Sequence, residues 1–493
     1  MNTQRPILLT GQFNDRDDDC ACPDKAFLLV FEQGESSEMD HDCACPDGAM
    51  GLTAVPTTPF IPHFTQTTAH TQPLPGDNHL AYSPYAPGGP SVLNQEAWQR
   101  WQQFATPQPL RDPIDHDLAA QNLLLPEDTA VTPKYTTPQT LTAWMHITNA
   151  CNLECPYCYV RKSSARMAEA TGRKAVQQIF ATAQQYGFKR VKLKYAGGEA
   201  TLHFKLVRQL HELAQALAKQ TSLELREVIL SNGVHLRPAD ADWLATEQVK
   251  LMISLDGIGA AHDRQRPMKG GGATFDHVAH TIDQILQPRG IRPDITITVT
   301  QQNAGDVAEA VRWVLARDLP VSLNFYRQNL LSANRADLAL EEQAIIDGML
   351  AAYAVFEEML PERPFFNGLL DRVQAEAHAH TCGVQHSYLV VSHEGRLAQC
   401  QMHVNQPSEH MLDGDLLLPM ALGPIQNLSV DQKECRDCEF RYRCTGGCPL
   451  ETYRATGRWD VKSPHCNIYK TLLPAALRLE GLRLLKTNNL LPS

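Results

Sequence analysis

Three cysteines in the run TNACNLECPYCY, residues 148–159, constrain the fold of this chain more than any other feature. Their spacing, C-x3-C-x2-C, supplies three thiolates, from Cys151, Cys155 and Cys158. A 4Fe–4S cluster held by three thiolates keeps one iron free of protein and open to a small chelating ligand. A structural zinc site is the alternative, but it needs four ligands, and residues 159–381 contain no cysteine to supply the fourth. The run therefore predicts a reactive cluster.

The remaining cysteines also fall in groups, so that none of the fourteen is left as an isolated core thiol. The chain of 493 residues is long enough for two or three domains. It begins without the basic and apolar run of a signal peptide and has no stretch of about 18 apolar residues, which predicts a cytoplasmic protein without a membrane partner. In that compartment grouped cysteines indicate metal or cluster ligation rather than disulfides. The net charge of −11 argues against nucleic acid as a partner.

The middle of the chain predicts an α/β fold, because apolar strand patterns alternate with amphipathic helix patterns. Residues 141–147 are apolar enough for a buried strand that delivers the cysteine run at its carboxyl end. Five more strands are expected at 191–195, 226–231, 249–255, 295–299 and 320–326, with helices within 176–183, 207–217, 275–285 and 307–315. Six units are two short of a closed eight-fold barrel, so we expect a partial (β/α)6 TIM-like barrel with right-handed crossovers.

Polar residues follow several of these strands, where parallel sheets bind their ligands. Gly197 and Gly198 let the backbone approach a ligand closely, and the Glu199 carboxylate can accept from an ammonium group. The segments 231–233, Ser-Asn-Gly, and 254–257, Ser-Leu-Asp-Gly, follow the third and fourth strands. A lone Gly-Gly-Glu segment is also typical of an ordinary turn.

Together with the cysteine run, these motifs resemble the radical S-adenosylmethionine (SAM) superfamily. The resemblance implies that SAM chelates the open iron, that Tyr157 lies near the adenine, and that Gly197, Gly198 and Glu199 bind the methionine amino group. It also implies ribose-binding or carboxylate-binding roles for Ser231, Asn232, Ser254 and Asp256. Arg266, in a polar segment after the fourth strand, is expected to pair with a carboxylate, with a solvated surface arginine as the alternative.

Seven further cysteines occupy the C-terminal third of the chain. Their intervals predict two clusters, one of them held by only three protein thiolates, or one cluster and one zinc ion. With Gly395, the spacing resembles the SPASM extension of radical SAM enzymes. That resemblance implies a distal cluster on Cys435, Cys438, Cys444 and Cys466 and a proximal cluster on Cys382, Cys400 and Cys448. A zinc ribbon on Cys435, Cys438, Cys444 and Cys448 is the alternative.

The proximal set differs from that of the fully ligated SPASM members. Those members carry a further cysteine shortly before the position of Cys382, and residues 369–381 of this chain contain none. Glu376, His378 and His380 lie there instead, within an expected helical linker, and are candidates for the fourth ligand. The alternative is a proximal cluster whose fourth iron is open to substrate.

An internal repeat marks residues 1–76, which are expected to form an acidic, partly disordered arm. Residues 17–24 read DDDCACPD and residues 40–47 read DHDCACPD. Three explanations stay open: a zinc ion bound by the four thiols, a tethered copy of a peptide substrate, or a disordered arm without a ligand. The thiols concerned are Cys20, Cys22, Cys43 and Cys45.

Residues 77–135 are expected to form a small domain. It faintly resembles the winged-helix-like leader-peptide recognition domains of ribosomal peptide maturases, which bind peptide by strand addition. A packing cap on the barrel is the alternative. The other expected units are a radical SAM barrel at 136–330, a helical linker at 331–381, a SPASM domain at 382–470 and a C-terminal tail at 471–493.

The resemblance implies a radical SAM/SPASM maturase that abstracts hydrogen from a peptide or protein through a 5′-deoxyadenosyl radical, with SAM and three 4Fe–4S clusters as cofactors. The leading product is a cross-link such as a cysteine thioether. Formylglycine, as in anaerobic sulfatase maturases, is the first alternative, and a non-catalytic iron–sulfur electron carrier is the second. Expected partners are a peptide or protein substrate, with or without a leader peptide, and a reductant such as flavodoxin or ferredoxin. Tyr326 and Arg327, after the sixth strand, are the candidates for substrate contact and catalysis.

Overall fold

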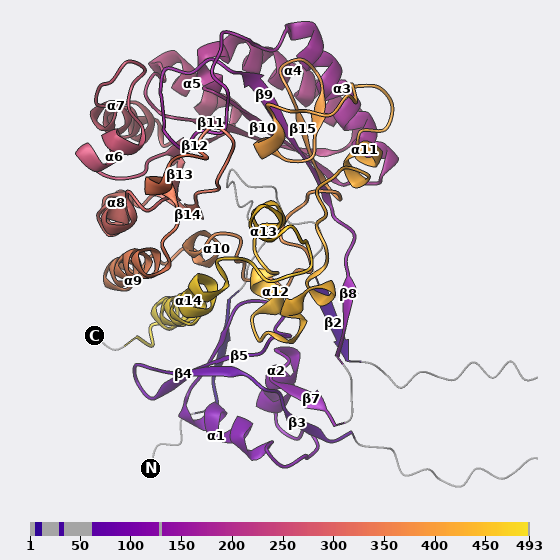
Figure 1. The fold of residues 1–493 in the computed structure, drawn as a ribbon. Coiled ribbons are helices and arrows are strands. Elements are labelled where there is room, and N and C mark those ends of the chain that lie inside the picture. Colours follow the sequence, from indigo (N-terminus) through magenta and orange to yellow (C-terminus); the bar gives the residue numbers. More distant parts are fainter. Residues whose placement is uncertain (1–4, 12–28, 34–61, 128–130, 492–493) are drawn as a thin grey trace, which may run out of the picture.

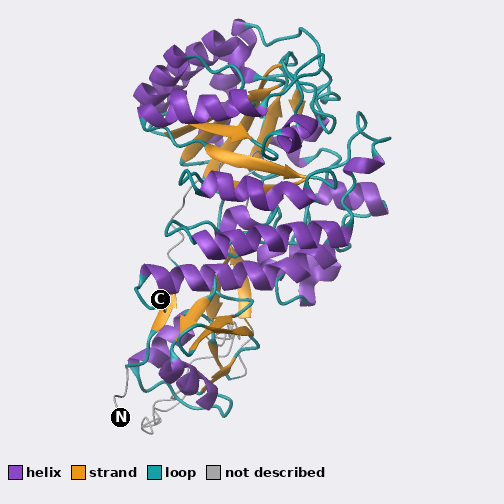
Figure 2. Ribbon diagram, turned by 90° about the vertical axis from the view of Figure 1, so that its left-hand side faces the viewer, coloured by secondary structure: helices purple, strands orange, loops and turns teal. Residues whose placement is uncertain are grey.

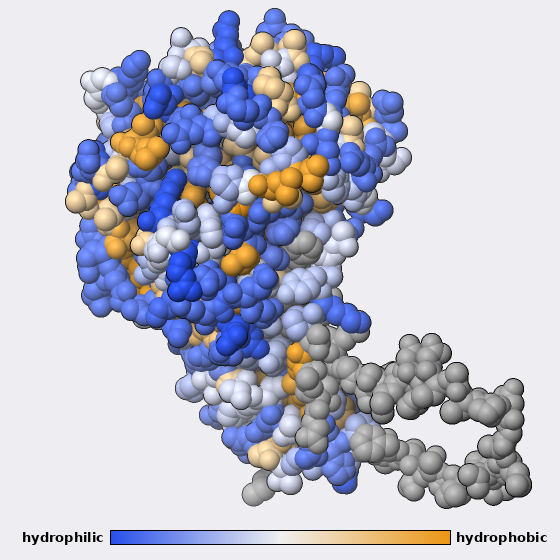
Figure 3. All heavy atoms as spheres, turned by 45° about the vertical axis from the view of Figure 1, so that its right-hand side comes forward, coloured by the Kyte–Doolittle hydropathy of each residue, from blue (hydrophilic) through white to orange (hydrophobic). Residues whose placement is uncertain are grey.

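The computed structural model describes residues 5–11, 29–33, 62–127 and 131–491, which form three tiers (Figure 1). An α/β unit lies at one end, a small β-rich unit lies at the other, and a cysteine-rich region with long helices lies between them. Figure 2 shows these long helices stacked in layers beneath the sheet. In Figure 3 the molecule narrows toward the small unit, and apolar side chains are scattered over the visible face. No helix within the described ranges has both the length and the apolar character to span a lipid bilayer.

Six parallel strands form the core of the α/β unit, in the order β14-β13-β12-β11-β10-β9. Their bounds are β9 Thr140–Thr148, β10 Arg190–Gly197, β11 Glu224–Ser231, β12 Lys250–Ser254, β13 Asp294–Val299 and β14 Val321–Phe325. Leu193 packs in the main apolar core, and its neighbours Lys192 and Lys194 are buried as well. Strand β10, which contains these residues, is therefore covered on both faces, as in parallel sheets that other layers flank. The prediction of a partial six-stranded barrel is confirmed.

Helices cover the outside of this sheet, because each turns an apolar stripe toward the strands (Figure 1). They are α3 Glu169–Gln185, α4 Phe204–Thr221, α5 Pro238–Glu247, α6 Ala260–Gln265, α7 Phe275–His280 with a π-helical continuation Thr281–Leu286, and α8 Val307–Leu315. The apolar spacing did not predict α5, which buries Asp240 beside Ala241 and Leu244. The Asp240 carboxylate is satisfied there by Arg208 and Arg237, at 2.9 and 2.6 Å.

Two strands from the cysteine-rich region extend the same sheet. β15, Tyr388–Val391, pairs in parallel with β9, and β16, Leu397–Ala398, pairs antiparallel with β15. The register places Leu389 opposite Ala143 and Val391 opposite Met145. The free edge of β9 is thereby covered, and the cysteine-rich region is fixed to the strand that carries the first cysteine run.

The small unit contains a four-stranded antiparallel sheet in the order β1-β6-β5-β4. Its strands are β1 Leu8–Thr10, β4 His70–Leu74, β5 Asn78–Tyr82 and β6 Ser91–Leu93. Helices α1, Gln95–Gln103, and α2, Pro113–Ala120, pack on it through Trp101 and Leu118. Two further antiparallel pairs complete the unit: β3 Phe64–Gln66 with β7 Leu124–Pro126, and β2 Leu29–Gln33 with β8 Val131–Tyr135.

The expected boundary at residue 77 is wrong, because the small unit begins earlier. Phe64 and Leu74 are buried, so the segment that contains β3 and β4 belongs to the folded unit rather than to an extended arm. Residues 8–10, also expected in the arm, form β1. The duplicated segments 17–24 and 40–47, with their four cysteines, lie outside the described residues.

The expected helical linker at 331–381 is helical only in part. It contains a 3-10 turn Ala336–Leu338, α9 Glu342–Met359 and α10 Phe366–Leu369, whereas residues 370–381 form turns and loops. The reason is that backbone groups in this loop bond to the cysteine-rich region. His378 N donates to Tyr442 O at 3.0 Å, and Ala379 O accepts from Val430 N at 2.8 Å. These bonds take the place of the backbone hydrogen bonds that an α-helix would form within itself.

The expected tail at 471–493 is wrong, because most of it belongs to α14, Cys466–Thr487. This helix packs against α9 on one side and the small unit on another, and Gln72 Nε2 donates to Pro474 O at 3.0 Å. It buries residues around much of its circumference, among them Leu472, Leu477 and Leu485. A helix enclosed on several sides shows no single apolar stripe, which is why the sequence pattern did not reveal it.

If α14 is a core helix, a substitution that leaves a cavity between it and its neighbours should destabilise the whole chain. Leu472→Ala, at a fully buried position, is expected to lower the unfolding free energy by about 2–5 kcal/mol. Leu490→Ala, in the same segment but 38% exposed, is the matched control and should change it by less than about 0.5 kcal/mol. Guanidinium denaturation followed by circular dichroism measures both, and equal midpoints for the two variants would contradict the packing described for α14.

Candidate active site

A cavity of about 230 Å³ opens at the carboxyl ends of the parallel strands. We call it the cleft. Its lining includes all three cysteines of the first run and, from the C-terminal third, Cys400 and Cys448. Every residue expected to bind SAM or substrate also lines it, except Asp256: Tyr157, Gly197, Gly198, Glu199, Ser231, Asn232, Ser254, Arg266, Tyr326 and Arg327. The fold thus brings together two cysteine groups that are far apart in the sequence.

The first cysteine run forms a loop directly after β9. Leu153 N donates to Cys151 Sγ at 3.4 Å, and Asn232 Nδ2 lies 3.9 Å from the same sulfur. Burial raises the pKa of the Cys155 thiol to about 12. Such a thiol ionises only when a cation compensates its charge, and a bound iron does so. The loop therefore fits a metal cluster, while a lone buried thiolate would be costly.

The last residue of β10, Gly197, and the residue after it, Gly198, must be glycine because this loop approaches them closely. A Cβ on Gly197 would lie 2.3 Å from Thr148 O, and a Cβ on Gly198 would lie 2.3 Å from Ala150 O. The backbone φ of Gly197 is +152°, which side chains rarely adopt. Gly198 N donates to Thr148 O at 2.7 Å. The glycines thus tie the end of β10 to the start of the cysteine loop.

Glu199 joins this loop to the end of β11. Its Oε1 accepts from Thr201 N, Thr201 Oγ1 and Ser231 Oγ at 3.1, 2.7 and 2.9 Å, and its Oε2 accepts from Asn232 N at 2.7 Å. The side chain is only 2% exposed, so these bonds offset the cost of burying a carboxylate. Oε2 accepts fewer bonds than Oε1 and keeps room for one more donor. The carboxylate is therefore held in one orientation at the edge of the cleft.

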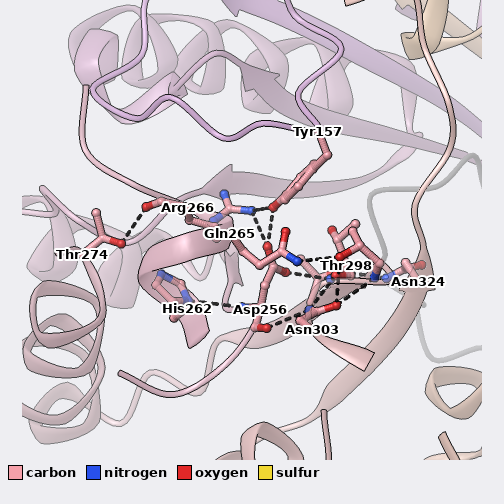
Figure 4. Close-up of polar contacts among 11 residues, drawn as sticks. Tyr157, Asp256, His262, Gln265, Arg266, Thr274, Thr298, Asn303 and Asn324 are labelled. Atoms are coloured by element: carbon pink, nitrogen blue, oxygen red, sulfur yellow. Dashed lines mark hydrogen bonds and ion pairs between the residues drawn. The ribbon is translucent and has the colours of Figure 1, made fainter. Parts of the chain in front are cut away.

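Figure 4 shows a network behind the cleft wall in which Tyr157 and Arg266 converge on Asp256. The Tyr157 hydroxyl donates to Asp256 Oδ2, and Arg266 Nη1 donates to the Tyr157 hydroxyl and, at 3.2 Å, to Asp256. Asp256 Oδ1 accepts from Thr298 N at 2.7 Å. Asp256 is fully buried and its carboxylate is already engaged. The structure thus places it where it positions Tyr157 and Arg266, behind the residues that face the cavity.

Tyr326 and Arg327 lie at the mouth of the barrel after β14. The Tyr326 hydroxyl is 2.6 Å from Ser332 Oγ, and burial raises its pKa. Arg327 Nη2 donates to Asp371 Oδ2 at 2.6 Å, and its Nη1 donates to Phe325 O at 3.0 Å. Both side chains reach the cleft while each is held by a neighbour. The geometry of both side chains suits contact with a substrate in the cleft.

The seven C-terminal thiols form two groups. Burial, followed by the neighbouring Cys448 and Cys382, raises the pKa of Cys400 to about 12. Burial raises the pKa of Cys444 to about 12 in the same way, with Cys435, Cys466 and Cys438 as its neighbours. Cys448 lies with Cys400 at the cleft, so the four thiols of the zinc-ribbon alternative are divided between the two groups.

The thiol groups suit clusters, in which each thiolate binds its own iron. Among the residues in the described ranges, no three His, Cys, Asp or Glu side chains gather closely enough to hold one metal ion.

Lys433 lies between the two C-terminal groups, and its Nζ donates to Thr445 O at 2.9 Å. Burial lowers the pKa of this lysine, although the thiols of both groups oppose that shift.

The three candidates for a fourth proximal ligand do not line the cleft. His378 Nδ1 is 3.0 Å from Glu376 O, and His380 Nδ1 is 2.7 Å from Asn427 O. Burial lowers the pKa of His380 to about 4, so its ring is neutral at physiological pH. Asn427 lies beside Cys382, and its Nδ2 is 2.6 Å from Cys382 O and 3.9 Å from the Cys382 sulfur.

Two basic residues that line the cleft, Lys162 and Arg372, were not predicted as site residues from the sequence. Lys162 follows Cys158 by four residues, and this closeness to the cysteine run was a usable signal. Arg372 lies in the segment before Cys382, where only metal ligands were sought. Its φ of +65° is a left-handed conformation that no sequence pattern predicts for arginine.

Residues 145–314 match the family model of the Radical SAM superfamily. The chain is 29% identical over 168 residues to the sporulation killing factor maturation protein SkfB of Bacillus subtilis, covering 34% of this chain and 38% of that protein. It is 24% identical over 319 residues to a serine-type anaerobic sulfatase-maturating enzyme of Klebsiella aerogenes, covering 61% of this chain and 77% of that protein. Residues 145–314 thus match the family that the cysteine run resembles, and the matches favour an enzyme over an electron carrier.

A solved structure has the same fold. The enzyme anSMEcpe with bound AdoMet and the Cp18Cys peptide aligns with a TM-score of 0.59, covering 71% of this chain and 99% of that one, at 18% identity. The alignment covers more of this chain than the 145–314 match alone. It supports the arrangement of a barrel with a C-terminal extension.

A substitution at Gly198 tests the close contact between the end of β10 and the cysteine loop. Gly198→Ala would push its Cβ into Ala150 O and displace the cysteine loop, so we expect SAM affinity to fall at least about tenfold, or about 1.4 kcal/mol. Gly305→Ala is the matched control, because a Cβ at Gly305 meets nothing within 4 Å. Calorimetric titration of anaerobically reconstituted protein with SAM measures both, and equal affinities would contradict the contact.

Proposed function

We propose that this chain, which is a radical SAM enzyme, matures a peptide or protein by joining a cysteine sulfur of the substrate to one of its carbons as a thioether. One observation carries the proposal: thiols of the first run and of the C-terminal third line a single cavity. A substrate in that cavity touches both groups at once. Sulfur and carbon can then be held close together, and such proximity is the main contribution that a protein makes to a bond-forming step.

Several features support a peptide as the substrate class. SkfB is named a maturation protein, and the anSMEcpe structure contains a Cys-bearing peptide. The cleft of this chain carries Lys162, Arg327 and Arg372, which suit the carboxylates and carbonyls of a peptide.

We assign SAM cleavage to residues 136–330 and the auxiliary clusters to a SPASM domain at 382–470. Three clusters follow: one on Cys151, Cys155 and Cys158, a proximal one on Cys382, Cys400 and Cys448, and a distal one on Cys435, Cys438, Cys444 and Cys466. When bound, SAM and the first cluster would supply a 5′-deoxyadenosyl radical able to take a hydrogen atom from carbon, and the proximal cluster would supply an open iron for a substrate thiolate.

The residues around the cleft have separate roles in this proposal. Glu199, held by Ser231 and Asn232, orients the amino group of SAM, and Ser254, at the end of β12, lines the same cleft. Tyr157 and Arg266, fixed by Asp256, form the wall near the adenine. Tyr326 and Arg327 contact the substrate. Leu153, Val160, Leu230, Phe325 and Met402 exclude water, which protects a carbon radical from side reactions.

The remaining partners follow from this chemistry. SAM cleavage needs one electron, which we assign to a reductant such as flavodoxin or ferredoxin. The small unit is proposed as the site that receives the amino-terminal part of the peptide. A zinc ion on Cys20, Cys22, Cys43 and Cys45 stays a hypothesis, since these residues lie outside the described ranges.

Formylglycine formation is a second candidate, because the chain aligns with 77% of the length of a serine-type sulfatase-maturating enzyme. The two reactions leave different products. A thioether keeps its sulfur and loses two hydrogens, while oxidation of cysteine to formylglycine removes the sulfur and leaves an aldehyde.

The cluster assignment predicts the iron content. Anaerobically reconstituted protein should hold about twelve iron atoms as three 4Fe–4S clusters. Changing Cys151, Cys155 and Cys158 together to Ala should remove about four of them and abolish cleavage of SAM to 5′-deoxyadenosine. Changing Cys435 and Cys438 to Ala is the matched control and should lower the iron content while the first cluster keeps its spectrum. Cleavage that survives the triple change would refute the assignment.

The product class predicts a mass change. Incubation of the reduced enzyme with SAM and its Cys-containing substrate should yield a peptide lighter by two hydrogens that no longer reacts with iodoacetamide at one cysteine. A hydrazine probe for aldehydes is the companion measurement. A substrate that has lost its sulfur and binds the probe would replace the thioether proposal with the formylglycine alternative.

A further inference from the structure

A second cavity, of about 520 Å³, adjoins the cleft. We call it the side cavity. Among the residues that the structure describes, Tyr326 is the one that lines both the cleft and the side cavity. A peptide that occupies the cleft and continues past Tyr326 can therefore enter the side cavity. The chemistry proposed for the cleft leaves this second space without a role.

The wall of the side cavity is largely apolar. Small or aliphatic side chains form much of it: Ala333, Ala336, Ala339, Leu340, Ala455 and Pro464. Besides His465, one cation and one acid line it, Arg335 and Glu451. The Arg335 guanidinium is already paired, because its Nε and Nη2 donate to the two carboxylate oxygens of Asp337 at 2.8 and 2.7 Å. Glu451 is therefore the acid that gives this cavity its chemical character.

Glu451 is a partly buried acid with an unpartnered oxygen. It lies in the first turn of α13, Pro449–Thr456, in the tier between the sheet and the small unit (Figure 1). Its Oε2 is shielded from solvent and has no hydrogen-bond partner within the chain. Buried polar atoms in folded proteins are nearly always hydrogen-bonded. A carboxylate left in this state fits a site whose donor comes from a ligand.

Two arginines lie close enough to Glu451 to affect its pKa, and both are engaged elsewhere. Burial raises the pKa of Glu451, and Arg327 and Arg454 oppose that rise without cancelling it. Arg327 Nη2 donates to Asp371 Oδ2 at 2.6 Å, and Arg454 Nη1 donates to Gln328 O at 2.5 Å. A further cation at Glu451 would stabilise the ionised carboxylate.

An apolar cavity with one acid on its wall suits an aliphatic side chain that ends in a cation. Lysine and arginine lay their methylene stems along apolar surface and place the charged end group on a polar partner. Hydrogen bonds between a cation and a carboxylate are roughly twice as strong as those between neutral groups. A short neutral donor such as serine would reach the carboxylate but would leave the apolar wall uncovered.

Helical spacing places this acid close to the cleft. Cys448, which lines the cleft, is the N-cap residue of α13, and Glu451 follows it by three positions. Side chains three positions apart on a helix are separated by about 5–6 Å at Cβ. An extended peptide advances by about 3.5 Å per residue. A substrate cysteine in the cleft and a basic side chain at Glu451 would therefore be about one or two residues apart.

We infer that the side cavity is a specificity subsite, in which Glu451 receives the ammonium or guanidinium group of a substrate lysine or arginine close to the modified cysteine. The inference rests on the proposed function and names the class of peptide that the same cleft accepts. Tyr326 lies on the wall between the two positions of the peptide. Glu451 selects the substrate and takes no part in making or breaking a bond.

The test measures the binding of labelled peptides to the full chain, reconstituted anaerobically with its clusters. One probe is fluorescein-Gly-Gly-Cys-Gly-Lys-Gly-Gly. Its matched control has norleucine in place of lysine, which keeps the aliphatic stem and removes the charge. A second pair places the variable residue before the cysteine and reports the direction of the bound peptide. In at least one pair, the lysine peptide should bind at least about tenfold more tightly by fluorescence anisotropy.

A substitution at Glu451 should remove this preference. Glu451→Gln keeps the shape of the side chain and removes its charge, so the lysine and norleucine peptides should bind within twofold of each other. Glu212→Gln is the matched control, because Glu212 is an exposed acid on α4 that lines neither cavity. This variant should keep the full tenfold preference.

A measurement without peptide separates a binding role from a structural one. The alternative role for Glu451 is to stabilise the first turn of α13, as acids do near helix N-termini. Asp371→Asn breaks a buried ion pair with Arg327 and should lower the thermal unfolding midpoint by at least about 2 °C. Glu451→Gln should leave the midpoint unchanged or raise it, because no partner is lost. An equal drop for both variants would assign Glu451 a structural role and overturn the inference.

The outcomes distinguish this inference from the proposed function. Equal affinities of the lysine and norleucine peptides in both orders, or no binding of either lysine peptide, overturn the inference. The same preparation is assayed for cleavage of SAM to 5′-deoxyadenosine. Cleavage without a preference for lysine leaves the proposed function standing and removes the subsite. A preference for lysine without any cleavage refutes the proposed function instead.

Discussion

Strand β9 connects the two halves of the cleft, because it pairs with β10 on one side and with β15 on the other. Its carboxyl end becomes the first cysteine loop, and β15 lies in the segment between Cys382 and Cys400. A parallel ladder fixes the relative position of its two strands through several hydrogen bonds at once. The separation of the two thiol groups is therefore set by sheet register, and substrate chemistry in the cleft depends on that register.

The cleft is built from charges and thiols that would be costly if they stood alone. Glu199 accepts four hydrogen bonds, and Asp256 holds Tyr157 and Arg266 while it is fully buried. Cys155 and Cys400 have pKa values raised to about 12, with burial as the main cause. The carboxylates are satisfied by the protein itself, whereas the buried thiols need a compensating cation in order to ionise. The hydrogen-bonded carboxylates fix the positions of the residues around the cleft, and the thiols are the candidate ligands of cofactors.

The small unit is joined to the rest of the protein by packing on α14 and by specific bonds to the cysteine-rich region. Arg443 is almost fully buried, and its Nη2 donates to Gly88 O at 2.6 Å. Arg441 Nη2 donates to the Tyr85 hydroxyl at 2.9 Å. These contacts fix the small unit relative to the thiols of residues 435–466.

The sequence by itself determined the chemistry of the site and the order of its strands. C-x3-C-x2-C specifies three thiolates because ligand number is a local property, and six apolar runs separated by helix patterns predict six parallel strands because backbone periodicity is local as well. Only the tertiary structure decided which groups meet. Pairing of β15 with β9 brings Cys400 and Cys448 to the first cysteine loop, enclosure on several sides makes α14 a core helix, and Lys162 and Arg372 enter the cleft from segments without a distinctive pattern. Contacts between residues hundreds of positions apart depend on how the layers pack, and no local period of the sequence records that packing.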